Sequence, residues 1–490
     1  MTQMPPTSLR ILMVAAEMSP YVKTGGLADV LGALPHALHA MGHDVRVVIP
    51  RYGLIDGAQF GVRVLCEHIP VPIDDGVDFV TVEEAMSGAV PVWLMAHNDY
   101  FNRDGVSMYD DDDRRFVFFC RAALESIRQL DWQPDVIHCH DWQTAMIPHL
   151  LRTTLAGDSW FQGIATLLTI HNLAFQGVFG HRVLQIAGVP RHDFEVVEAP
   201  SASDSVRLLA GGIYYADIIN SVSPSYAHDM LDPEYGEGLD AILRSRRDRV
   251  YGVLNGIDSV AYDPQQDAAI CAPYAVTALA GKQACKRDLQ HSLGLTVSDT
   301  TPVLVMVSRL TALKGFDVLD ACLESLLGDL GVQVVVMGTG QQRFHDRLNE
   351  LRARFPHQLA FRLTFDEVLA RRMVAGADLY LMPSRNEPCG TAQMIAMRYG
   401  AVPIVHATGG LKDTVRPYND LTNEGNGFAF RPLTPTEFLQ TLHKALAMYA
   451  QPHLWRQLMI RGMTTDFSWQ VAAKQYADLY RRALTAHMPL

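Results

Sequence analysis

The stretch LMPSRNEPCGTAQMIAMRYGAVPIVHATGGLKD, residues 381–413, twice passes from an apolar run through a turn rich in proline or glycine into a helical pattern. The first turn carries Glu387, and the second carries Thr408, Gly409 and Gly410. Buried apolar strands that alternate with helices are typical of parallel sheets covered on both faces. Helix N-termini that follow such strands bind anions. This stretch therefore predicts an α/β fold with an anion-binding edge.

The same alternation of strands and helices occurs in two regions of the chain. Predicted strands occupy residues 11–17, 43–50, 135–140, 165–172 and 216–223, and then 302–308, 332–338, 359–363, 378–383 and 401–407. The periodicity lapses around 255–300, and 490 residues exceed what one core organises. We predict a domain over 1–262, a second over 263–465, and an amphipathic helix over 466–490 whose apolar stripe needs a partner surface.

Composition narrows the class of protein. The 41 basic and 53 acidic residues give a net charge of −12, which argues against a broad contact with nucleic acid. The chain has no apolar stretch of membrane-spanning length, and MTQMPPTSLR at its start does not resemble a signal peptide. Its seven cysteines are scattered without CxxC pairs, as in reduced proteins. We expect a cytoplasmic protein that binds neither nucleic acid nor membranes; the sequence carries no signal for its oligomeric state.

A glycine-marked turn follows the first predicted strand. Lys23 precedes Gly25 and Gly26 at the start of a predicted helix, so a cation, backbone amides and the positive helix end converge there. This arrangement suits a diphosphate. The turn lacks the GxGxxG pattern, which argues against a nicotinamide or flavin dinucleotide site. The alternative is a tight turn that only packs on the sheet.

Three charged residues of the second region are candidates for catalysis. Arg309 and Lys314 follow a predicted strand, where two cations would suit a pyrophosphate leaving group. Glu387 is predicted to open a helix, and it could accept hydrogen bonds from sugar hydroxyls or stabilise positive charge at an anomeric carbon. The alternatives are surface placement of the cations and a glutamate that only complements a helix dipole. Cys389 is interpreted as a packed residue rather than a nucleophile.

Histidines and an aspartate end two strands of the first region. Residues 138–141, His-Cys-His-Asp, could suggest a metal site, but neighbouring strand residues alternate faces and cannot all reach one ion. We predict that Asp141 caps the helix beginning near Trp142. His171 and Asn172 end the strand ATLLTI at the equivalent edge. His171 is either a structural histidine or a contact to a sugar hydroxyl.

Taken together, the motifs resemble those of bacterial glycogen synthase and plant starch synthase. The resemblance runs nearly end to end and rests on KTGGLADV (23–30), HDWQT (140–144), TIHNLAFQG (169–177), SVSPSYA (221–227), YGEGLDAIL (235–243), LNGID (254–258), SRLTALKGFD (308–317), GTG (338–340), AGADLYLMPSRNEPCG (375–390) and ATGGLKDTV (407–415). It implies the GT-B fold: two Rossmann-like, doubly wound parallel-sheet domains facing across a cleft, with a C-terminal helix that crosses back to the N-terminal domain.

The same resemblance implies an activity and its participants. The expected reaction transfers glucose from ADP-glucose to the 4-hydroxyl at the non-reducing end of an α-1,4-glucan such as glycogen or a maltooligosaccharide, with retention of configuration. ADP-glucose is a donor substrate, and the resemblance implies neither a cofactor nor a metal.

The resemblance also assigns site residues. The expected catalytic residues are Glu387, His171, Arg309 and Lys314. The expected substrate contacts are Lys23, Gly25, Gly26, Asp29, Asp141, Asn172, Asn255, Cys389, Gly390, Thr408, Gly409 and Gly410.

The chain departs from the family pattern at several positions. Asn386, Thr391 and Ala392 lie beside the expected catalytic carboxylate, and two further departures are Gln341 and Ala210. Ile395 stands where many retaining enzymes of this fold carry a second glutamate, so we favour front-face displacement over a double-carboxylate mechanism. Three alternatives stay open: a diverged glucosyltransferase with altered donor or acceptor, an inactive glucan-binding homologue, and a nucleotide-dependent oxidoreductase or epimerase.

Overall fold

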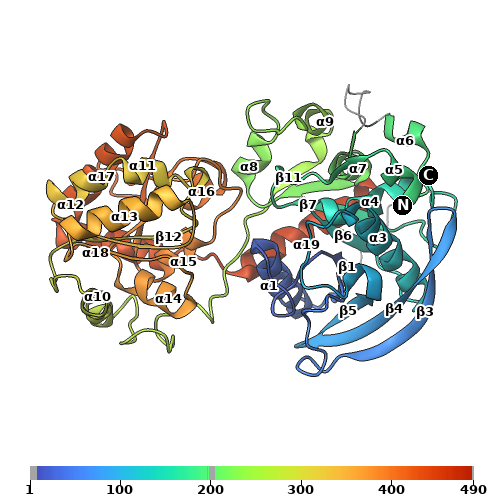
Figure 1. Ribbon diagram of the computed structural model, residues 1–490, viewed down its shortest axis with the longest axis horizontal. Coiled ribbons are helices and arrows are strands. Elements are labelled where there is room, and N and C mark those ends of the chain that lie inside the picture. The colour runs from blue at the N-terminus through green and yellow to red at the C-terminus, as the bar shows by residue number, and fades with distance from the viewer. Residues whose placement is uncertain (1–7, 196, 198–204, 488–490) are drawn as a thin grey trace. The chain divides into compact units, whose positions relative to one another are not determined.

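The computed structural model describes residues 8–195, 197 and 205–487 (Figure 1). The expectation about a signal peptide falls largely on residues 1–7, which lie outside the described residues. The chain divides into two compact units. The first unit comprises Met1–Asn255 and Trp469–Leu490, and the second comprises Gly256–Ser468.

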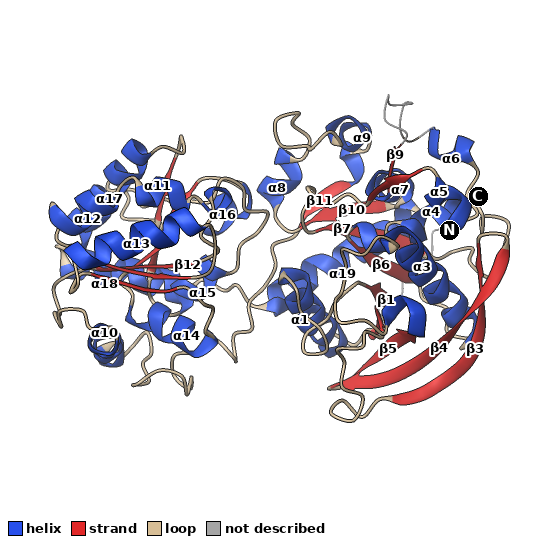
Figure 2. Ribbon diagram, viewed as in Figure 1, coloured by secondary structure: helices blue, strands red, loops and turns tan. Residues whose placement is uncertain are grey.

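The first unit is built on a nine-stranded sheet of order β11-β10-β7-β6-β1-β2-β5-β4-β3 (Figure 2). The strands are β1 (Arg10–Val14), β2 (Asp44–Pro50), β3 (Arg63–Ile73), β4 (Gly76–Ser87), β5 (Val90–Ala96), β6 (Val136–His140), β7 (Ala165–Ile170), β10 (Ile218–Ser221) and β11 (Val250–Gly252). From β11 to β5 all neighbours are parallel. Their continuous apolar runs are explained by burial on both faces of the sheet.

The β3–β4 hairpin at one edge was not predicted. Both of its pairings, β3 with β4 and β4 with β5, are antiparallel. In β3, Ile69, Val71 and Ile73 are buried while Pro70 and Pro72 are exposed. One solvated face gives a period-two pattern in place of a continuous apolar run, and the prolines obscure it further.

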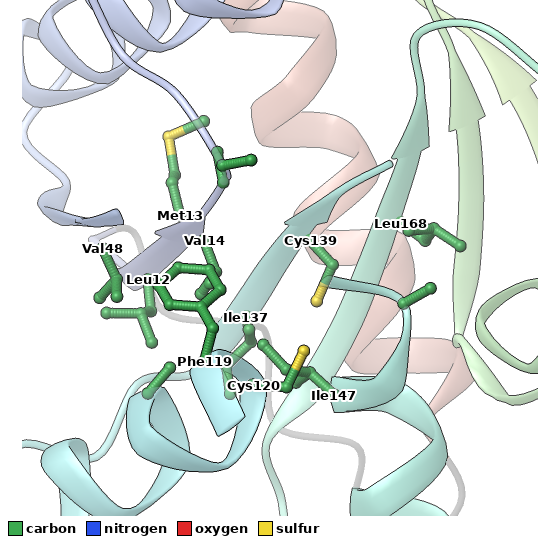
Figure 3. Packing of buried hydrophobic residues seen from close by; sticks show 14 of the residues in the cluster. Leu12, Met13, Val14, Val48, Phe119, Cys120, Ile137, Cys139, Ile147 and Leu168 are labelled. Atoms are coloured by element: carbon green, nitrogen blue, oxygen red, sulfur yellow. The ribbon is translucent and has the colours of Figure 1, made fainter. Parts of the chain in front are cut away.

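Helices cover both faces of this sheet. On one face, Phe119 and Cys120 of α3 (Asp112–Gln129) and Ile147 of α4 (Met146–Arg152) pack against β1 and β6 (Figure 3). The remaining helices and strands of the first unit are α1 (Gly26–Ala40), α2 (Asn98–Phe101), η1 (Trp142–Thr144), β8 (Val178–Gly180), α5 (Arg182–Ile186), α6 (Arg191–Glu195), β9 (Ser205–Arg207), α7 (Leu208–Tyr215), α8 (Pro224–Asp229), α9 (Asp240–Ser245), η2 (Arg247–Arg249) and α19 (Trp469–Ala486).

The last helix, α19, completes the core of the first unit. It contacts α1, β6, β7 and β10, far from it in sequence. Its apolar stripe includes Trp469, Tyr476 and Tyr480, all buried. The Tyr480 hydroxyl lies 2.9 Å from Nδ1 of His138 on β6. The predicted C-terminal helix that returns to the N-terminal domain is therefore confirmed.

The second unit contains a six-stranded parallel sheet of order β14-β13-β12-β15-β16-β17. Its strands are β12 (Val303–Val307), β13 (Gln333–Met337), β14 (Leu359–Arg362), β15 (Leu379–Met382), β16 (Val402–His406) and β17 (Phe428–Phe430), of which only β17 was not predicted. Its helices are α10 (Ala280–Ser292), η3 (Ala312–Lys314), α11 (Phe316–Asp320), α12 (Leu323–Gly328), α13 (Gln342–Arg354), α14 (Glu367–Gly376), α15 (Ala392–Arg398), α16 (Gly409–Thr414), α17 (Pro435–Tyr449) and α18 (Pro452–Thr464).

The first unit ends at Asn255, earlier in the chain than the predicted boundary at 262. Residues just after Asn255 pack within the second unit. The Ile257 amide donates to the Phe467 carbonyl oxygen at 2.8 Å, and the Arg371 guanidinium lies 4.8 Å from the centre of the Tyr262 ring. The return to the first unit falls between Ser468 and Trp469.

The packing of α19 predicts a graded loss of stability at Tyr480. Tyr480→Phe should cost about 1–2 kcal/mol, because it leaves a buried histidine nitrogen without its hydroxyl partner. Tyr480→Ala should cost about 3–5 kcal/mol, because it also empties a fully buried ring site. Calorimetry of the unfolding transition of the first unit measures both losses of stability. Arg481→Ala, at a partly exposed position on the same helix, is the control; equal effects of all three variants would contradict the predicted contribution of Tyr480.

Candidate functional site

In the second unit, a cation and a carboxylate meet where β12 and β15 end. Lys314 Nζ lies 2.7 Å from Glu387 Oε2, and the Ser384 hydroxyl lies 3.1 Å from the same oxygen. Glu387 is only 9% exposed, so water screens this ion pair weakly. The structure thus brings together two residues that the sequence predicted for catalysis.

The turns that carry these two residues are locked to each other by backbone contacts. Gly315 has φ 70°, and a Cβ atom there would collide with the Pro383 carbonyl oxygen, so only glycine fits. The Arg385 amide donates to the Leu313 carbonyl oxygen at 2.9 Å. The Arg385 guanidinium also holds both carboxylate oxygens of Asp317 at 2.7 Å. Such bidentate pairs fix geometry as well as charge.

The prediction that Glu387 opens a helix is wrong. Helix α15 begins only at Ala392, with Thr391 at its N-cap, and Glu387 lies in the preceding turn. The turn needs a left-handed residue, Gly390, with φ 74°. Glu387 is therefore oriented by its side-chain partners rather than by a helix dipole.

The second glycine motif packs directly on the Glu387 turn. The Gly410 amide donates to the Glu387 carbonyl oxygen at 3.1 Å. A Cβ atom on Gly409 would collide with that carbonyl oxygen, and one on Gly410 would collide with the Cys389 carbonyl oxygen. Thr408 forms the N-cap of α16 and is buried. The two glycines thus have a packing function at this turn, which the sequence analysis did not predict.

Arg309 is exposed at the same edge of the second sheet, two residues after β12 ends. Within the described part of the chain, its side chain forms no salt bridge. Gly338 and Gly340 lie so close to the carbonyl oxygens of Ser308 and Leu310 that a Cβ atom on either glycine would collide with them. The GTG turn therefore supports the backbone that presents Arg309.

In the first unit, the turn at Lys23–Gly26 that was expected to bind phosphate surrounds a carboxylate of the protein itself, that of Glu17. Lys23 pairs with Asp29 at 2.6 Å, and both side chains are about half exposed. The buried carboxylate of Glu17 accepts the amide and hydroxyl of Thr24 and, at 3.2 Å, the amide of Gly25. The Gly25 amide thus donates to Glu17 in this structure, and a substrate contact at Gly25 stays a prediction.

The part played by Glu17 was not predicted, whereas the helix start at Gly26 was. Gly26 is the first residue of α1, and Gly25 is its N-cap without a side-chain cap. Glu17 is the last residue of the predicted strand 11–17, and nothing in its spacing marks it as a partner of the turn.

Asp141 has an unusual backbone conformation. Its φ of 58° and ψ of −172° belong to a region that residues other than glycine rarely occupy. The conformation is held because its amide donates to the Thr169 carbonyl oxygen at 3.0 Å, while its Oδ1 accepts the His171 amide at 2.7 Å. Asp141 occupies the predicted N-cap position before Trp142, but its side chain makes no capping hydrogen bond, since the carboxylate is turned to His171 instead. Burial raises its pKa to about 7.

His171 and Asn172 follow β7 beside Asp141. Nε2 of His171 lies 2.9 Å from Nδ1 of His140, and burial lowers the pKa of His171 to about 3. Asn172 accepts the Ala174 amide at 3.1 Å. Asn255, at the end of the first unit, is buried, and its carboxamide oxygen has no hydrogen-bond partner among the described residues.

No group of three His, Cys, Asp or Glu side chains in the described ranges is arranged to hold a metal ion. In those ranges there is likewise no helix with the length and apolar character needed to cross a membrane.

Comparison with known proteins agrees with the two-unit architecture. Residues 10–245 match the family described as starch synthase catalytic domain, and residues 294–457 match glycosyl transferases group 1. A glycogen synthase of Syntrophotalea carbinolica is 44% identical over 98% of this chain and 100% of its own length. Glycogen synthase 2 of Geobacter sulfurreducens is 42% identical over 97% and 99%.

A solved structure gives the same result. The catalytic domain of starch synthase IV from Arabidopsis thaliana, bound to ADP and acarbose, superposes with a TM-score of 0.88 at 32% identity, covering 98% of this chain and all of that one. The two Rossmann-like units and these matches define a glycosyltransferase of the GT-B class. The chain belongs to the family of glycogen and starch synthases, which are glucosyltransferases.

The environment of Asp141 predicts a pH-dependent contribution to stability. The folded state retains its proton up to about pH 7, whereas an ordinary aspartate has a pKa of 3.8. The stability that the protonated Asp141 carboxyl contributes is fully present below pH 4 and is lost as the pH rises through 7. The Asp141→Asn variant has no titrating group at this position, so its stability lacks this pH dependence. The free energy of unfolding of the wild type should therefore fall relative to Asp141→Asn by about 1.4 kcal/mol per pH unit between these limits.

Denaturant titrations of both proteins at several pH values measure this difference. The buried histidines titrate in both proteins, so their effect cancels in the difference between the two free energies of unfolding. Stability curves that run parallel from pH 4 to pH 7 would contradict the raised pKa.

Proposed function

We propose that this protein transfers glucose from ADP-glucose to the non-reducing-end 4-hydroxyl of an α-1,4-glucan with retention of configuration. The observation that carries the proposal is the Lys314–Glu387 pair at a sheet edge that also presents the exposed Arg309. The proposal is supported by relatives named glycogen synthase and by a starch synthase structure that holds ADP and acarbose.

The two cations act on the leaving group. As the bond between the anomeric carbon and the phosphate oxygen breaks, negative charge develops on ADP. Arg309 and Lys314 neutralise that charge, which lowers the barrier most in the transition state. Glu387 holds the Lys314 ammonium in place and stabilises positive charge at the glucosyl carbon.

Retention follows from displacement on one face of the sugar. The acceptor 4-hydroxyl attacks the anomeric carbon from the side that ADP leaves, and its proton passes to the departing phosphate. The position eight residues after Glu387 is Ile395, which cannot act as a second carboxylate. No cofactor or metal is needed in this scheme, because side chains supply the positive charge.

Residues of the first unit contact the donor and the acceptor. We assign Lys23 to the donor phosphates, and contacts to glucose or acceptor to Asp29, Asp141, His171, Asn172 and Asn255. The unpartnered carboxamide oxygen of Asn255 suits a sugar hydroxyl. All seven cysteines are free thiols, which supports our placement of the protein in the reducing cytoplasm.

Substitution of the cations should slow turnover more than it weakens binding. For Arg309→Ala and Lys314→Ala we expect kcat to fall by about 30- to 1000-fold, equivalent to about 2–4 kcal/mol, with a small change in KM for the donor. Steady-state kinetics measure both constants. Arg287→Ala is the matched control, because Arg287 is exposed and pairs with Asp299 away from these residues. Wild-type kcat in both site variants would refute the assignment.

An assay of ADP release separates the candidate functions. We expect release from ADP-glucose to require glycogen or a maltooligosaccharide, and to be slower when UDP-glucose replaces ADP-glucose. An inactive glucan-binding protein releases no nucleotide under any condition. A preference for UDP-glucose would identify a diverged transferase, and nicotinamide-dependent turnover would identify an oxidoreductase.

A further inference from the structure

Two histidine rings from neighbouring strands share one hydrogen bond beside the proposed sugar site. His140 ends β6, and His171 follows β7, which pairs with β6 in parallel. His140 Nδ1 and His171 Nε2 are 2.9 Å apart, so one of them donates and the other accepts. Burial lowers the pKa of both rings, so each is neutral near pH 7 and carries one N–H. The direction of this bond therefore fixes which nitrogen of His171 bears a proton.

The surroundings of His140 favour one direction. His140 is fully buried, and its Nε2 has no hydrogen-bond partner among the described residues. If His171 donated to His140, the His140 proton would sit on Nε2 as a buried donor without an acceptor, which folded proteins rarely contain. If His140 donates, its Nε2 is only an unused acceptor, which proteins tolerate more often than an unused N–H.

The His138 ring packs against the His140 ring and restricts its rotation, so His140 cannot move its Nδ1 away from His171. The centres of the two rings are 4.0 Å apart. His138 is itself fixed by the Tyr480 hydroxyl at 2.9 Å and by the Thr169 hydroxyl at 2.7 Å. The backbone of His171 is held separately, because its amide donates to the Asp141 carboxylate. Both the ring and the main chain of His171 are thus constrained.

We propose that His140 is a positioning residue that donates from Nδ1 to His171 Nε2, so that His171 presents an Nδ1–H donor to an acceptor oxygen of the sugar. Nδ1 of His171 has no partner within the described residues, and the residue is partly exposed. His171 then acts as a hydrogen-bond donor rather than as a general base. The use of this donor rests on the proposed glucosyl transfer, whereas the proton position does not.

The tautomer can be read directly by NMR on the full-length wild-type protein without substrate. Long-range ¹H–¹⁵N spectra of protein labelled in histidine distinguish a protonated from a bare ring nitrogen, and loss of one ring signal in His171→Gln assigns the residue. We expect Nδ1 of His171 to be protonated and Nε2 to be bare at pH 7.5. A protonated Nε2 would overturn the proposal, whether or not the protein transfers glucose.

Two substitutions of His140 then test the positioning. The amide nitrogen of Asn can donate from the place of Nδ1, whereas Leu has similar bulk and no donor. His140→Asn should keep the His171 tautomer and lie within about threefold of wild-type kcat, while His140→Leu should give mixed tautomers and lose about tenfold or more. Thermal unfolding of both variants measures any general loss of fold. An unchanged His171 tautomer in His140→Leu would overturn the proposal.

Discussion

The arrangement of the second unit depends on close approach between backbones at the ends of parallel strands. Gly315 lies against Pro383, Gly409 lies against Glu387, and Gly338 lies against Ser308, each at a distance that excludes a Cβ atom. These contacts bring loops that are far apart in the sequence into one layer. The backbone contacts therefore determine where the charged side chains on these loops lie. The ion pair of Lys314 and Glu387 is thus set by the main chain first and by charge second.

The first unit controls its polar groups by a different means. Burial lowers the pKa of His138 and His140 and keeps both rings neutral, and it raises the pKa of Asp141 so that this carboxyl is partly protonated near neutral pH. Neutral imidazole and carboxyl groups can both donate and accept hydrogen bonds with hydroxyls. The second unit instead holds the Lys314–Glu387 ion pair and the exposed Arg309.

Much of the fold could be predicted because buried parallel strands leave a simple pattern. β12 and β16 are continuous apolar runs, and both were found at nearly their observed bounds. The β3–β4 hairpin was missed because one of its faces is exposed. Most of the site residues came from the resemblance to known synthases rather than from spacing. The pairing of Glu387 with Lys314 and the use of Gly25 by Glu17 could not be predicted, since both depend on how separate loops meet.

The position of α19 has a consequence for synthesis of the chain. Its tyrosines Tyr476 and Tyr480 belong to the core of the first unit, yet they follow the whole second unit in the sequence. The second unit is one continuous segment and can fold while the chain is still growing. The first unit must wait with an uncovered sheet face until α19 has been synthesised. Nascent chains that stall in the second unit would therefore expose an apolar surface to chaperones and proteases.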